Sequence, residues 1–88
     1  MEITVDDALK RAISAHSKGK LQEAERLYRA ILKSYPKHPD ANHNLGILKI
    51  CENKNNEALP FLKAALEANP QMEQFWLSYV DVLIREGY

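Results

Sequence analysis

Residues 20–36, KLQEAERLYRAILKSYP, return in altered form 34 residues later as residues 54–70, KNNEALPFLKAALEANP. Six of the seventeen aligned positions are identical, whereas average composition gives about one identity by chance. The identical pairs are Lys20/Lys54, Glu23/Glu57, Ala24/Ala58, Ala30/Ala64, Leu32/Leu66 and Pro36/Pro70. A period of this length indicates a chain built from repeated helical units that stack on one another.

Each copy carries apolar residues at the spacing of one helix face, i, i+3, i+4, i+7 and i+8. They are Ala24, Leu27, Tyr28, Ile31 and Leu32 in the first copy and Ala58, Phe61, Leu62, Ala65 and Leu66 in the second. Pro36 and Pro70 are expected to end these two helices because proline cannot donate the next backbone hydrogen bond. Pro60 lies inside the second copy, where we expect a bend and not a break because the stripe continues on both sides of it.

A helix is also predicted before each copy, and the turns between them are marked. Residues 5–18 follow a capping box of Thr4 and Asp7, and residues 39–52 begin with proline, which the first turn of a helix tolerates. Gly19, Asn53 and Gly87 recur at one phase, and these residue types best accept the left-handed conformation that ends a helix. With a fifth helix near residues 72–86, the pattern predicts an all-α fold.

Composition narrows the class of protein. With 88 residues, the chain has room for one modest core and hence one domain. Twelve Lys and Arg balance twelve Asp and Glu, which gives no global field to attract nucleic acid or an anionic membrane. Cys51 is the single cysteine, so no internal disulfide can form, and neither a signal peptide nor a membrane span is visible. We therefore expect a cytoplasmic protein.

The phase of the repeat resembles the tetratricopeptide repeat (TPR) family, whose pattern is W-x2-L-G-x2-Y, then A-x3-F, then P. The matching positions are Ala24, Tyr28 and Pro36 in the first repeat and Leu45, Gly46, Ala58, Leu62 and Pro70 in the second, with Trp76 in the extra helix. The sequence departs from the pattern where Ala8, Ala15, Asn42 and Lys49 replace large aromatic residues. The resemblance implies a right-handed α-solenoid of helix-turn-helix repeats: repeat 1 at about residues 5–36, repeat 2 at about 39–70 and a capping helix at about 72–86.

The small residues of the pattern have a physical purpose of their own. Ala12, Ala24, Gly46 and Ala58 allow paired helices to approach closely, and Tyr28, Leu62 and Trp76 are expected to fill the space between them. Trp76 and Tyr79 are accordingly predicted to be core residues.

The resemblance also implies a binding groove lined by the first helix of each pair, where a peptide or a helix of a partner protein would lie. The side chains expected there are Leu9, Ile13, His16, His43, Asn44, Ile47, Gln74 and Ser78. Aliphatic and polar groups alternate among them, as recognition of an extended segment requires. Asn44 is the residue we single out, because its amide can both donate to and accept from a ligand backbone. An exposed helical Asn without a partner is the alternative.

Several kinds of site are disfavoured. Relatives that grip a terminal carboxylate use a set of Lys, Arg and Asn residues, of which only Asn44 is present here. His16, His38 and His43 lack the spacing of a metal site, and Cys51 lies eight residues from His43 with no orienting acid evident. No glycine-rich phosphate loop occurs. We therefore expect no enzyme activity, no metal and no cofactor.

The fifth helix carries more apolar side chains than one neighbour can cover. They are Phe75, Trp76, Leu77, Tyr79, Val80, Val82, Leu83 and Ile84. Part of this helix should be exposed, so that self-association through it is a second possibility. The alternative to a groove-binding module is therefore a structural or oligomerisation segment. Residues 64–77 also resemble repeat segments that precede catalytic domains in bacterial transferases, which suggests an N-terminal appendage of such an enzyme.

Overall fold

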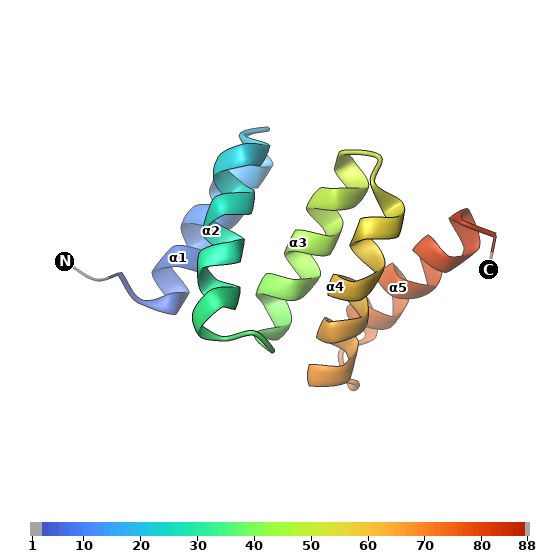
Figure 1. Ribbon diagram of the computed structural model, residues 1–88. Coiled ribbons are helices and arrows are strands. Elements are labelled where there is room, and N and C mark those ends of the chain that lie inside the picture. The colour runs from blue at the N-terminus through green and yellow to red at the C-terminus, as the bar shows by residue number, and fades with distance from the viewer. Residues whose placement is uncertain (1–2, 88) are drawn as a thin grey trace.

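The computed structural model describes residues 3–87, which form five α-helices and no strand. The helices are α1 (Val5–Ser17), α2 (Leu21–Ser34), α3 (Pro39–Cys51), α4 (Asn55–Ala68) and α5 (Glu73–Arg85). Figure 1 shows α1 beside α2, α3 beside α4, and α5 next to α4 at the far end of an elongated molecule of 45 × 27 × 19 Å. The predicted all-α class is confirmed, and each of the three helix ranges predicted from the sequence agrees to within a residue or so at either end.

The starts of α1 and α3 follow from local hydrogen bonds. The backbone N–H of Asp7 donates to Thr4 Oγ1 at 3.0 Å, which caps α1 as the sequence predicts. Pro39 is the first residue of α3, and the backbone N–H of Ala41 donates to His38 Nδ1 at 3.1 Å. His38, one of the three histidines considered for metal binding, is therefore a helix cap.

The turn residues adopt the conformation that their type predicts. Gly19, Asn53 and Gly87 have φ values of 77°, 62° and 81°. Two closing hydrogen bonds also recur 34 residues apart, from the N–H of Lys20 to the carbonyl of Ala15 and from the N–H of Lys54 to the carbonyl of Lys49, each 2.8 Å long. The repeat in the sequence is thus matched by a repeat in the backbone. Pro60 lies inside α4, which runs through it unbroken.

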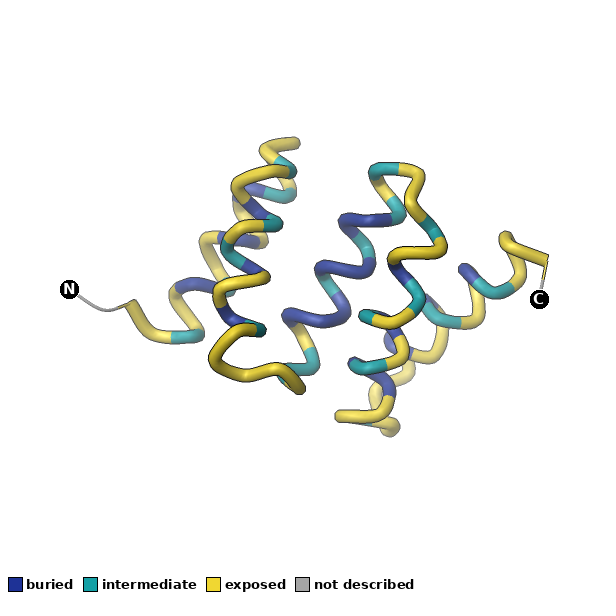
Figure 2. The backbone as a smooth tube through the Cα atoms, in the orientation of Figure 1, coloured by how far each residue is buried: buried dark blue, intermediate teal, exposed yellow. Residues whose placement is uncertain are grey.

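The core runs along the length of the molecule, and α3 is its centre. Most residues of α3 are buried, as the dark-blue segments of Figure 2 show. One cluster joins α1, α2 and α3, and others join α4 to α5; their buried members are Ala12, Ala15, Ala24, Tyr28, Leu45 and Leu48 on one side and Ala58, Leu62, Ala65, Leu66, Phe75 and Val82 on the other. At Gly46 an added Cβ would lie 2.6 Å from Leu62 Cδ2, which confirms the predicted close approach of α3 and α4.

The prediction that Trp76 is a core residue is wrong. Its side chain is 48 % exposed, and Nε1 donates to the carbonyl of Pro70 at 2.8 Å. The reason is that α5 packs on α4 with the side that carries Phe75 and Val82, whereas Trp76 lies on the opposite side. Tyr79 is half-buried against Leu62 and Val82. The predicted exposure of part of this helix is confirmed.

Among residues 3–87, no helix is long and apolar enough to cross a membrane.

Candidate functional site

The candidate site is the face to which α1, α3 and α5 contribute. In Figure 1, α1 and α5 lie behind α2 and α4. Side chains link α1 to α3 and α3 to α5 directly, through one polar cluster at each junction. The eight residues predicted for a groove all belong to these three helices.

The junction of α3 and α5 is closed by two buried side chains. His43 Nε2 lies 2.8 Å from Ser78 Oγ, and the two residues are 9 % and 8 % exposed. The His43 ring stacks at 4.8 Å on Phe75, and Gln74 Nε2 donates to Ser78 Oγ at 3.4 Å. Burial lowers the pKa of His43, although Asn44 and Asp40 act in the opposite direction. His43 is therefore neutral near pH 7 and acts as a link between helices.

The junction of α1 and α3 holds a cluster that spacing alone does not reveal. Cys51 Sγ lies 3.8 Å from His16 Nε2, and His16 Nδ1 lies 3.3 Å from the Tyr28 hydroxyl. Burial lowers the pKa of His16, while Cys51 is exposed. The thiol is thus paired with His16 and not with His43, the partner considered from the sequence. Tyr28, which is fully buried, fixes the orientation of the imidazole.

The remaining predicted site residues differ in how much they offer to a ligand. Ile13 and Gln74 are exposed, whereas Leu9, Asn44 and Ile47 are half-buried. Leu9 packs against the cluster of α1, α2 and α3, and Ile47 packs against the cluster of α4 and α5. The accessible part of the face therefore consists of Ile13, Asn44 and Gln74, supported by the two buried junctions beneath.

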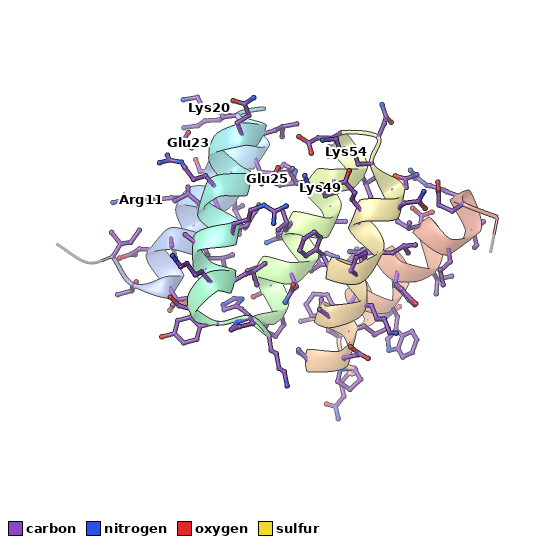
Figure 3. All side chains as sticks on the ribbon, viewed as in Figure 1. Arg11, Lys20, Glu23, Glu25, Lys49 and Lys54 are labelled. Atoms are coloured by element: carbon purple, nitrogen blue, oxygen red, sulfur yellow. The ribbon has the colours of Figure 1, made fainter. Side chains whose placement is uncertain are left out.

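An ion-pair cluster between α2 and α3 was missed by the sequence analysis. Lys49 Nζ donates to Glu25 Oε1 at 3.1 Å and to Glu52 Oε1 at 3.3 Å, and the Lys49 side chain is 5 % exposed. Figure 3 shows Lys49 and Glu25 approaching each other from neighbouring helices. Burial acts to lower the pKa of Lys49, but the two carboxylates outweigh it and the net shift is upward. Burial likewise acts to raise the pKa of Glu25, but Arg29 and Lys49 lower it overall.

The departures from the repeat pattern at positions 42 and 49 could have directed attention to this region. Asn42 is buried like Lys49, and its Nδ2 donates to the carbonyls of Pro36 at 3.0 Å and His38 at 3.1 Å. Both polar side chains occupy places where the pattern has large aromatic residues. The partners of Lys49 could not be foreseen, because Glu25 lies 24 residues away along the chain.

Two further features lie outside the candidate face. A hollow of about 620 Å³ is lined by Ile3, Val5, Leu27, Ile31, Tyr35 and their neighbours, at the start of α1 and along α2. Within residues 3–87, no group of three or more His, Cys, Asp or Glu side chains is placed to hold a metal ion.

No family model matches the sequence, and a search of curated proteins finds no match.

Proposed function

We propose that this chain is a protein-interaction module of the TPR type, a right-handed solenoid of two helical hairpins and a fifth helix. It binds an extended or helical segment of a partner protein along the face of α1, α3 and α5. The 34-residue period supports this proposal at three levels: the identical residues, the left-handed turn residues Gly19, Asn53 and Gly87, and the two equivalent turn hydrogen bonds.

The observation that carries the proposal is the construction of this face. His43 with Ser78 and His16 with Cys51 tie α3 to its two neighbours, so the spacing of the three helices is set by contacts beneath the surface. Above them, Asn44 lies half-buried on the central helix, with Ile13 and Gln74 exposed on the helices at either side. A half-buried amide can pair with a peptide backbone, and exposed aliphatic groups can pack against its side chains.

The test is selection of binders from a random peptide library displayed on phage, followed by mapping of amide chemical shifts. A selected peptide should shift the amides of Ile13, Asn44 and Gln74. Asn44→Ala should weaken its affinity by about tenfold, the effect of losing roughly 1.4 kcal/mol. Asn56→Ala is the matched control, because Asn56 is an exposed helical Asn on α4. Shifts confined to α2 and α4, or equal affinity of all three proteins, would contradict the proposal.

We assign the chain no catalytic activity of its own, no cofactor and a cytoplasmic location. The thiol–imidazole pair of Cys51 and His16 has the Tyr28 hydroxyl, and not a carboxylate, at the second ring nitrogen. A hydrolase or transferase activity that is present in the purified chain and absent from Cys51→Ser would overturn this part of the proposal.

A structural role remains the second candidate, and the exposed apolar side of α5 favours it. A position in front of a transferase domain has no support beyond the resemblance of residues 64–77.

A further inference from the structure

The exposed side of α5 corresponds to a side that is covered in the preceding helical unit. Trp76, Val80 and Leu83 follow Asn42, Gly46 and Lys49 of α3 by 34 residues in each case. In α3 all three positions are buried, and Leu62 and Ala58 of α4 lie within 3.4 Å of the place of a Gly46 Cβ. In α5, Trp76 is 48 % and Val80 43 % exposed. By the internal repeat, this side of α5 is built to receive an antiparallel helix.

We propose that the helix received is α5 of a second copy, so that the chain forms a twofold dimer with Val80 on the axis. The face is self-complementary in this register. Antiparallel pairing about Val80 places Trp76 opposite Ile84 of the second copy, and Leu77 opposite Leu83, in each case twice. An interface of this kind uses the same surface on both chains.

The apolar residues form one continuous surface on the helix. At about 100° per residue, the exposed set of Trp76, Leu77, Val80, Leu83 and Ile84 spans about 120° of the helix circumference. Phe75, Ser78 and Val82 are buried on the opposite side. Helix α5 is thus apolar on two sides, of which α4 covers one.

The area of this surface fits a dimer. The exposed fractions are 48 % for Trp76, 55 % for Leu77, 43 % for Val80 and 70 % for Ile84. Together with Met72, which is 42 % exposed, they offer roughly 500 Å² per copy, or about 1,000 Å² in total, which is the size at which specific interfaces begin. The expected affinity is therefore weak, in the micromolar range.

Charge favours the antiparallel direction over the parallel one. Glu73 lies at the start of α5 and Arg85 at its end, where Arg85 now pairs with Asp81 at 3.0 Å on the surface. Antiparallel pairing brings Arg85 of one copy towards Glu73 of the other, and it also opposes the two helix dipoles. Parallel pairing would place Glu73 beside Glu73.

The test is sedimentation equilibrium on the full chain from about 1 µM to about 1 mM, the range in which a dissociation constant of this order is measurable. We expect a monomer–dimer equilibrium, which Val80→Arg should weaken at least 100-fold by placing two like charges on the axis. Ile84→Glu, at the most exposed position of the set, should weaken it also with little risk to folding. Ile13→Arg is the matched control, because Ile13 is 45 % exposed on α1, and it should leave the dimer intact.

Cysteine cross-linking in a Cys51→Ser background tests the register. Val80→Cys should form an intermolecular disulfide, whereas Ile84→Cys alone should not, because eight residues of helix separate the two sulfurs by about 12 Å. A chain that remains monomeric throughout, a dimer indifferent to Val80→Arg, or cross-linking through Ile84→Cys would overturn the proposal. A monomer whose α5 amides shift on addition of an amphipathic helical peptide would assign this surface to another protein. None of these outcomes touches peptide binding at Ile13, Asn44 and Gln74.

Discussion

Gly46→Ala should destabilise the chain, although the same substitution stabilises most helices. Replacing a helical glycine by alanine ordinarily contributes about 1 kcal/mol. Here the new Cβ would lie 2.6 Å from Leu62 Cδ2, 2.8 Å from Leu62 Cγ and 3.4 Å from the Ala58 carbonyl oxygen. Leu62 is fully buried, so its branch point has nowhere to move. At an overpacking cost of about 3 kcal/mol, the net loss is about 2 kcal/mol.

The assay is urea unfolding followed by far-UV circular dichroism, in the wild-type background and in Leu62→Ala. With the leucine truncated the clash disappears, and Gly46→Ala should then stabilise the chain by about 1 kcal/mol. Both backgrounds are measured in the same concentration of trimethylamine N-oxide, which keeps the truncated chain folded. The two effects have opposite signs and differ by about 3 kcal/mol. A gain in unfolding free energy for Gly46→Ala in the wild-type background would refute the close approach of α3 and α4.

Lys49→Ala should lower the free energy of unfolding by about 2–3 kcal/mol, because it removes a buried stem and both carboxylate contacts; Lys49→Met should recover most of the loss, and equal denaturation midpoints for the two variants would contradict this account. Because burial lowers the pKa of His43 and of His16, the unfolded chain takes up protons first, so stability should be constant above about pH 7 and decline as the pH falls through about 6.5. His43→Gln should make that decline shallower in pH-dependent thermal unfolding, and an unchanged slope would remove His43 as a contributor. Asn53→Ala should cost about 1 kcal/mol at φ 62°, whereas Asn53→Gly should cost nothing, and calorimetry of the pair would reveal any other order.

The period of the sequence predicted the helices because it recorded local chemistry. Gly19 and Asn53 end helices through their own backbone preferences, and Thr4 caps α1 through a hydrogen bond three residues away. Gly46 and Ala58 were also correctly placed, since small residues at one phase imply a helix contact. Features of this kind depend on few distant partners, and a single sequence therefore contains them.

Long-range partners were beyond the sequence. Lys49 was noted only as a missing aromatic residue, whereas its role depends on Glu25 of another helix. The thiol of Cys51 was compared with His43 on its own helix, but its neighbour is His16, 35 residues away. Trp76 was assigned to the core because the repeat pattern expects a covering helix, which the described residues do not supply. In each case the deciding contact comes from tertiary structure and not from spacing.

The placement of α3 between two sets of neighbours determines how the chain comes apart. Its buried residues belong to the cluster shared with α1 and α2, while Ile47 and Ile50 pack against the cluster of α4 and α5. Either terminal helix can fray by giving up contacts on a single side, whereas α3 can open only when both clusters dissolve. Amide protons of this one helix consequently report the global unfolding event, and those of the outer helices report partial openings that leave the middle of the molecule intact.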